Sequence, residues 1–207
     1  MSKLPLEILL TDEIGFSEVY GIIPNFVFGK EGILRLSDGK RWNVGRVRSM
    51  TVFKGNVLAV VDRKLIKLTE DGYEELPHPV PPKRHFEVID MHTREVWYEE
   101  TLENYPFKVL ANKENLILID NFCSFYKTND LKNWQELYRF DEKEIFEHEE
   151  CGKETFDDTW WIKSTVIVDD KIVSVGGFED GHFFLSLSLD NGERLSIKVD
   201  TCDSWKF

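Results

Sequence analysis

The sequence predicts an all-β fold, a β-propeller-like repeat of antiparallel hairpins with four or five blades. Three stretches share one order of strands and turns, and their apolar strands begin at Val57, Leu116 and Ile172, 59 and 56 residues apart. A recurring period of that size is typical of stacked or radially arranged units. Turn residues between the strands and the scarcity of helix signals favour the same class. The alternative is a β-sandwich or barrel assembled from the same hairpins.

The second repeat shows why these stretches are strands. Val57–Val61 is a continuous run of β-favouring residues with turn residues on both sides. Leu65–Leu68 then leads to Asp71 and Gly72, a pair that predicts a tight hairpin. Because the apolar run does not alternate with polar residues, it indicates a strand buried on both faces, as in the inner strands of a blade.

The third and last repeats follow the same order. In the third, the turn Asn112–Asn115 precedes the buried strand Leu116–Ile119. In the last, Asp169–Lys171 precedes Ile172–Val175, and Asp190–Gly192 forms a further hairpin tip. These positions predict strands of similar length separated by tight turns.

We predict a single all-β domain over residues 1–207, because this length is ordinary for one all-β domain and 42% apolar residues suffice for a core. A first, less regular unit surrounds Phe26–Phe28 and Ile33–Leu36. The predicted organisation is repeat units at about 20–46, 47–76, 105–140 and 163–199, a connector at 77–104 and an acidic insertion at 141–162.

Two segments between the repeats differ in composition from the repeats. Leu76–His85 contains four prolines, which exclude a helix and a central strand, so we expect an ordered connector there. Another hairpin is expected after it, with a turn near His92 and Thr93. The best helix candidate is Asp141–His148, whose acids suit a helix N-terminus, and an exposed loop is the alternative.

Charge is concentrated in one part of the chain. The net charge is −12, and the stretch from Asp141 to Asp158 holds nine acids and two lysines, a balance of −7. Nucleic-acid affinity comes largely from clustered Lys and Arg, so no nucleic-acid partner is expected. An acidic surface of this kind attracts a basic protein instead.

Two local motifs resemble those of known propeller families. The stretch TVIVDDKIVSVGGFEDG, with paired glycines Gly176 and Gly177, resembles a kelch repeat, in which such glycines let the backbone turn sharply and pack close to its neighbour. Tyr126 and Trp134 of the preceding repeat stand roughly where the kelch pattern has its aromatic residues. Residues 128–134, TNDLKNW, resemble the Asp-box hairpin, in which Ser or Thr, Asp and a Trp together pin a β-turn. Both resemblances imply a small β-propeller, and the Asp-box motif has a structural role in its family.

Candidate reactive residues are few and scattered. Cys123 lies in an apolar run, where we expect a buried, inert thiol, and three widely separated cysteines argue against a disulfide framework. The histidines lack HxH, HxxxH or HExxH spacing, so no metal ligands are predicted. The glycine-rich turns lack the helix that follows a nucleotide-binding loop. We therefore predict no catalytic residue, no metal and no cofactor.

The acidic insertion is the best candidate for a binding surface. Acids followed by adjacent tryptophans combine an aromatic anchor with an electrostatic rim, a common composition of protein interfaces. A solvated loop with one tryptophan in the core is the structural alternative. The predicted partner-binding residues are Glu147, His148, Glu149, Glu150, Asp157, Asp158, Trp160 and Trp161.

From charge and size we predict a non-catalytic protein-binding module, with a cytosolic inhibitor or immunity protein of a basic toxin or nuclease as a fitting role. The alternative is a carbohydrate-binding or glycoside-active propeller, since a glycosidase needs only two or three convergent carboxylates and the chain has 38 acids. The start, MSKLPLEILLTDE, falls short of a secretory signal, and no apolar run approaches the roughly 18 residues of a membrane span. We expect a soluble cytoplasmic protein with no membrane contact; the sequence does not indicate an oligomeric state.

Overall fold

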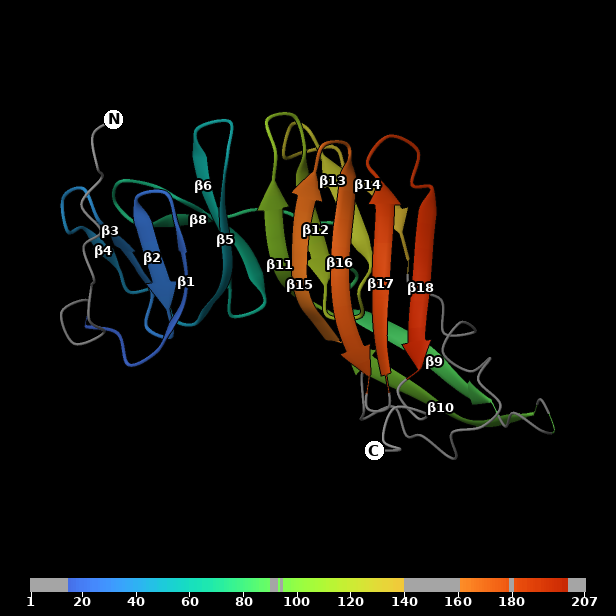
Figure 1. Ribbon diagram of the computed structural model, residues 1–207. Helices are drawn as coiled ribbons and strands as arrows, with labels where there is room; N and C mark the ends of the chain where they lie inside the picture. The colour runs from blue at the N-terminus through green and yellow to red at the C-terminus, as the bar shows by residue number, and fades with distance from the viewer. Residues whose placement is uncertain (1–14, 90–92, 94, 140–160, 179–180, 201–207) are drawn as a thin grey trace, which may run out of the picture. The chain divides into compact units, whose positions relative to one another are not determined.

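The computed structural model describes residues 15–89, 93, 95–139, 161–178 and 181–200. These residues form eighteen strands and no helix (Figure 1). A membrane-spanning helix is accordingly not among the elements described. The chain divides into two compact units, Met1–Leu76 and Pro77–Phe207.

The first unit contains two four-stranded antiparallel sheets, each joined in chain order. The strands of the first sheet are β1 (Val19–Ile23), β2 (Phe26–Gly29), β3 (Ile33–Arg35) and β4 (Arg41–Trp42). The strands of the second sheet are β5 (Val47–Phe53), β6 (Asn56–Val61), β7 (Lys64–Leu68) and β8 (Tyr73–Glu75).

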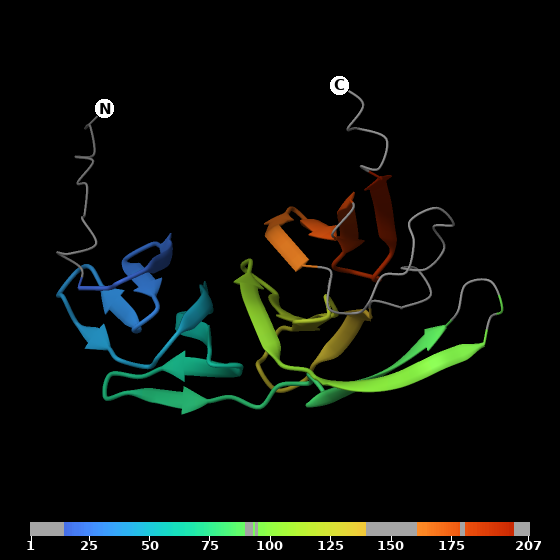
Figure 2. The ribbon, with the colours of Figure 1, turned by 90° about the horizontal axis from the view of Figure 1, so that it is seen from below.

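The second unit contains two further four-stranded sheets and one two-stranded hairpin. The strands of the third sheet are β11 (Pro106–Ala111), β12 (Leu116–Asp120), β13 (Phe125–Thr128) and β14 (Gln135–Tyr138). The strands of the fourth sheet are β15 (Trp161–Val168), β16 (Lys171–Phe178), β17 (Gly181–Ser188) and β18 (Arg194–Asp200). The long hairpin of β9 (Lys83–Ile89) and β10 (Val96–Glu103) is drawn in green in Figure 2.

Each four-stranded sheet is an up-and-down meander, which is the blade of a β-propeller. The predicted all-β propeller class is confirmed, and the described residues form four blades. A sandwich or barrel would merge consecutive hairpins into one or two continuous sheets, whereas here each sheet is separate.

Local sequence explains where the strands begin and end. The Asp71-Gly72 turn joins β7 to β8, as predicted, and the amide of Thr69 donates to the carbonyl of Gly72 at 3.0 Å. Asp62 and Arg63 join β6 to β7 with φ values of 43° and 73°, a left-handed turn that matches the twist of a hairpin. Strand β9 begins at Lys83, directly after the last proline of the connector, because proline cannot donate to a strand ladder.

A β-bulge or register irregularity recurs at one place in all four blades. The pairing of the first strand with the second shifts by one residue near the start of the first strand. The extra residue is Tyr20, Arg48, Phe107 or Lys163 in the four sheets in turn. A bulge increases the local twist of a strand, so each blade receives the same additional twist at the same strand.

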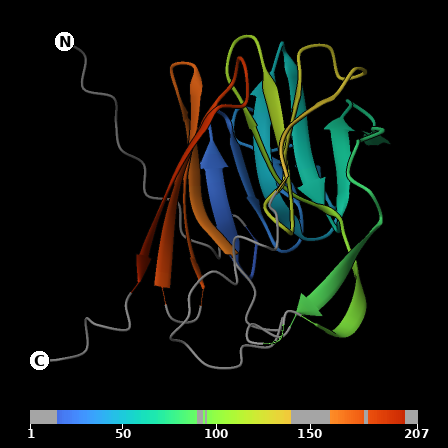
Figure 3. The ribbon, with the colours of Figure 1, turned by 90° about the vertical axis from the view of Figure 1, so that its right-hand side faces the viewer.

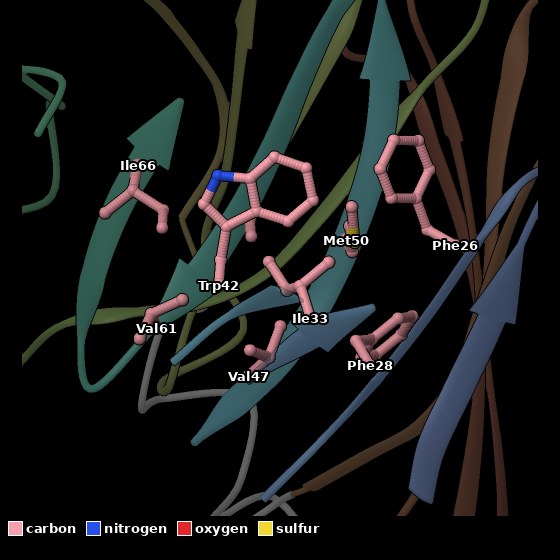
Figure 4. Packing of buried hydrophobic residues seen from close by; sticks show 9 residues of the cluster. Phe26, Phe28, Ile33, Trp42, Val47, Met50, Val61 and Ile66 are labelled. Carbon is pink, nitrogen blue, oxygen red and sulfur yellow. The ribbon is translucent and has the colours of Figure 1, made fainter. Parts of the chain in front are cut away.

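The core of the first unit lies between its two sheets (Figure 4). Phe26, Ile33 and Trp42 of the first sheet pack with Met50 and Ile66 of the second. Removing these side chains from water is the main stabilising contribution to such packing. The residues shown in Figure 4 are Phe26, Phe28, Ile33, Trp42, Val47, Met50, Val61, Ile66 and one unlabelled side chain.

Trp42 also ties the two sheets of this unit together through polar contacts. Its indole Nε1 donates to the carbonyl of Thr69 at 3.0 Å. Arg35 and Lys40 lie over its ring, 5.3 and 5.2 Å from the centroid, and both bind the carboxylate of Glu70. The cations thus contact an aromatic face and an acid together.

The third and fourth sheets share a second core. Ile117, Ile119 and Phe125 of the third sheet pack with Ile172 and Leu187 of the fourth. All five residues of β12 are buried, which confirms the prediction that its unalternating apolar run lies between two covered faces.

Two sequence interpretations in this region have different outcomes. The hairpin expected around His92 and Thr93 is present, since β9 and β10 pair antiparallel on either side of that position. The expectation that Gly176 and Gly177 form a sharp turn is wrong. They continue β16 and pair with Ile162 and Trp161, because the ladder of β15–β18 extends to Phe178.

Candidate functional site

Nearly all of the predicted partner-binding residues lie outside the described residues. These are Glu147, His148, Glu149, Glu150, Asp157, Asp158 and Trp160. Trp161 is the first residue of β15, and it pairs with Gly177 of β16. The acidic insertion therefore enters the chain between β14, the last strand of the third blade, and β15, the first strand of the fourth. The helix candidate Asp141–His148 also lies outside the described part.

A buried polar site surrounds Asp120, at the end of β12. One carboxylate oxygen accepts hydrogen bonds from the amides of Phe122 and Ser124, at 3.0 and 2.8 Å. The other accepts from the side-chain amide of Asn104 and the hydroxyl of Tyr126, at 3.1 and 3.3 Å. With four donors on two oxygens, this carboxylate is engaged in holding the β12–β13 turn.

Arg84 of β9 lies beside this carboxylate. Its guanidinium donates to the hydroxyl of Ser124 at 3.2 Å and lies over the ring of Phe122, 5.4 Å from the centroid. A cation here offsets part of the cost of burying Asp120. The side-chain oxygen of Asn104, by contrast, is buried without a hydrogen-bond partner. That oxygen is a destabilising feature of an otherwise satisfied network.

Burial controls the protonation of this site. Desolvation raises the pKa of Asp120, while hydrogen bonds from Ser124 and Asn104 oppose the rise. Burial also raises the pKa of the Cys123 thiol, to about 12, with a smaller contribution from the Asp120 charge. A thiol of that pKa stays protonated near neutral pH and is a poor nucleophile. The prediction that Cys123 is buried is confirmed.

The turn between β13 and β14 is held by Thr128 and Asp130, two of the three residues that the Asp-box resemblance implies. The hydroxyl of Thr128 accepts from the amides of Asp130 and Leu131, at 3.2 and 3.1 Å. The carboxylate of Asp130 accepts from the amides of Lys132 and Asn133, at 2.9 and 2.8 Å. The bonds from Asn133 and then Lys132 lower the pKa of Asp130 well below its usual range. Its contacts are those of an Asx turn.

Titratable groups do not converge on an open site within the described residues. His85 contacts the hydroxyl of Thr101 at 3.2 Å and the carboxylate of Glu99 at 3.6 Å on an exposed strand pair. No group of three potential metal ligands is present in the stretches that the structure covers. The arrangements seen there therefore stabilise turns and blades.

Sequence reasoning missed the network around Asp120. In the strand registers, Asp120 and Gly176 occupy equivalent positions, because each faces the first strand of its sheet at the bulge. The available signal was a buried strand ending in Asp with Ser four residues later, a spacing that allows a side-chain acceptor to close the turn.

Comparison with known proteins supports the fold and gives no family. No family model and no curated protein matches the chain. Among solved structures, "YCF48 bound to D1 peptide" matches with a TM-score of 0.50 and 14% identity, covering 83% of this chain and 50% of that one. The computationally designed Ika8 protein matches with a TM-score of 0.46 and 10% identity, covering 86% of this chain and 47% of that one. The chain thus spans about half the length of these structures.

Proposed function

We propose that the chain is a non-catalytic protein-binding module that uses its acidic insertion, residues 141–162, to hold a basic protein partner. The observation that carries the proposal is the charge of this insertion, −7 of a total of −12 between Asp141 and Asp158. Its place between β14 and β15 attaches it to two blades at once. Blades are rigid, and a connection between two of them is a suitable place for a recognition loop.

The described polar sites are consistent with a binding role. The carboxylates of Asp120 and Asp130 accept hydrogen bonds from backbone amides and neighbouring side chains. The Cys123 thiol is buried and protonated. The blades then act as a scaffold, and recognition falls to the segments between them.

A structure of similar fold provides a precedent for peptide binding. The YCF48 structure is that of a protein bound to D1 peptide, and at 14% identity the likeness extends to the fold alone. We extend to this chain only the general use of such blades to bind another polypeptide. The acidic insertion adds the chemistry, because it favours a basic partner over an acidic or neutral one.

Within this function, we favour an inhibitor or immunity protein of a basic toxin or nuclease. Such enzymes carry cationic active sites for nucleic acid. A concentrated negative charge increases the rate of association with them by about tenfold or more, and salt screens the effect. Fast capture is useful for a protein that must neutralise an enzyme inside a cell.

The test measures association of the full chain with a panel of purified basic nucleases, at low and high salt. One variant replaces the acids of the insertion, Glu147, Glu149, Glu150, Asp157 and Asp158, by Ser. The control variant removes the same number of exposed acids elsewhere, Asp71, Glu95, Glu114, Asp190 and Glu193. We expect slower association and a weaker salt dependence for the first variant alone.

Two results would contradict the proposal. Equal slowing in both variants would show that net charge, not the insertion, governs binding. Salt-insensitive binding to a glycan array, with no nuclease bound, would favour the carbohydrate-binding alternative.

A further inference from the structure

The turn between β17 and β18 contains the one asparagine of the sequence that is followed by glycine, Asn191-Gly192. This turn lies at one end of the fourth sheet (orange to red in Figure 3). An asparagine in front of a glycine is open to attack by its own main chain, because glycine has no Cβ to hinder its backbone nitrogen. The pair is therefore a candidate site of deamidation.

Deamidation at this pair consumes only water. The backbone nitrogen of Gly192 loses its proton and forms a bond to Cγ of Asn191, while the bond from Cγ to Nδ2 breaks and ammonia leaves with that proton. Water then opens the resulting five-membered imide at either carbonyl, which gives aspartate or isoaspartate. In isoaspartate the main chain runs through the former side chain, so the turn gains one backbone carbon.

Hydrogen bonds of the folded turn oppose this reaction. The amide of Gly192 donates to the carbonyl of Ser188 at 3.1 Å. The side-chain oxygen of Asn191 accepts from the amide of Glu193 at 3.0 Å. Because the Gly192 nitrogen must leave its acceptor to reach Cγ, the reaction requires the turn to open locally.

The same turn is fixed against β14 of the third sheet. Gly192 has a φ of 71°, and a Cβ on it would lie 2.7 Å from the carbonyl oxygen of Leu137. The guanidinium of Arg194 donates to the hydroxyl of Tyr138 at 2.8 Å and lies over its ring, 5.1 Å from the centroid. A contact this close has no room for an additional backbone atom. Isoaspartate at position 191 is therefore incompatible with the docked turn.

We propose that Asn191 is a deamidation site that the docked β17–β18 turn protects, and that its conversion to isoaspartate releases the turn from β14. The change runs in one direction, since ammonia is lost. Leu137 and Tyr138 are the last two residues of β14, so the modification acts where the chain leaves the third blade. The chemistry at Asn191 does not depend on the role of the acidic insertion that follows.

The first experiment incubates the full chain at neutral pH, folded and in guanidinium chloride. Mass spectrometry of the peptide that contains Asn191 follows the modification, with fragmentation that distinguishes aspartate from isoaspartate. We expect deamidation to be about tenfold or more slower in the folded chain, because only molecules with an open turn react.

Asn112 is the internal control for this experiment. Its side-chain oxygen also accepts from backbone amides, those of Glu114 and Asn115 at 3.0 and 2.7 Å, but Lys113 follows it. It should deamidate much more slowly than Asn191 in guanidinium chloride. Absence of isoaspartate at position 191 in the unfolded chain, or equal rates in the folded and unfolded chains, would overturn the proposal.

The second experiment refolds the modified chain and measures amide hydrogen exchange in β14 and β18. We expect faster exchange there than in Asn191→Gln carried through the same treatment, because that variant does not form the five-membered imide. Asn191→Asp adds the charge without the backbone carbon and should keep its protection. Circular dichroism checks refolding, and failure of the modified chain alone to refold would show the same incompatibility. Unchanged exchange in the modified chain, or equal loss of protection in Asn191→Asp, would contradict the release of the turn by isoaspartate.

Discussion

The side-chain amide of Asn104 donates a hydrogen bond of 3.1 Å to the carboxylate of Asp120, and both residues are buried. The amide oxygen of Asn104 has no partner, whereas the Asp120 carboxylate has four donors. One amide and one carboxylate thus share a site in which only the carboxylate is fully satisfied. The pair allows a direct test of what holds the β12–β13 turn.

We expect Asn104→Asp to lower the free energy of unfolding by about 3 kcal/mol or more, because it buries a second negative charge beside Asp120. The combined variant Asn104→Asp with Asp120→Asn restores one carboxylate and one amide, and should recover most of the loss. Urea unfolding of the three chains measures both effects. An unrecovered double variant would show that the position of the charge, and not its number, governs stability.

We expect Asp130 to stabilise the protein near neutral pH and to lose that stabilising contribution in acid. Its folded pKa lies below the ordinary value of 3.8, because amides of Asn133 and Lys132 donate to its charged form. A lowered folded pKa contributes stability above pH 3.8, and that contribution is lost as the pH falls through the folded pKa. In Asp130→Asn, we expect lower stability than wild type near neutral pH and a difference that shrinks in acid, measured by urea unfolding. A constant difference would contradict this.

Phe16 caps one face of the first sheet, and this aromatic cap should contribute substantially to the stability of the first unit. Phe16→Ala removes a buried ring from Val27 and Leu34, for which we expect a loss of about 3 kcal/mol or more in the free energy of unfolding. Tyr73→Ala is the control, since Tyr73 is exposed and its removal should change stability by about 0.5 kcal/mol or less. Similar losses in both variants would argue against the cap.

Cys123 should resist thiol reagents until the protein unfolds. Its side chain is buried, and burial raises its pKa to about 12. Reagents therefore cannot reach the thiol, and the thiol is not ionised to the reactive thiolate near neutral pH. The measurement uses Cys151→Ser with Cys202→Ser, which leaves Cys123 as the one thiol, and follows its labelling as urea is added. Labelling should rise together with unfolding. Rapid labelling of the folded chain would show that the third blade opens locally.

Strands and turns of this chain were predictable because their signals are local. The run Leu116–Ile119 predicts a buried strand, and the Asp71-Gly72 pair predicts a hairpin turn. Each prediction rests on a few neighbouring residues. The paired glycines of β16 gave a wrong prediction of a turn, because that prediction also rested on local sequence alone. Gly176 permits a turn, but pairing on both sides with Ile162 and Phe183 keeps it in the sheet.

The sequence carries a signal for the bond between Ser124 and Asp120, but the rest of the buried network around Asp120 could not be predicted from it. Its donors come from residues 104 to 126, on strands or turns whose contact depends on how β10, β12 and β13 lie together. Neither the net charge nor the pattern of apolar residues indicates which side chains distant in the sequence come into contact. The charge of the acidic insertion, by contrast, can be read in the sequence, while the residues that carry it lie outside the described part.

The bulge repeated in the first strand of each blade has a consequence for engineering. Blades that share this irregularity pair their first strand with the second through the same shift in register, whatever side chain fills the extra position, Tyr20, Arg48, Phe107 or Lys163. Their hairpins become exchangeable parts. A designer who transplants the second to fourth strands of one blade onto the first strand of another keeps the geometry at the junction, and a chain with repeated identical blades becomes a practical target.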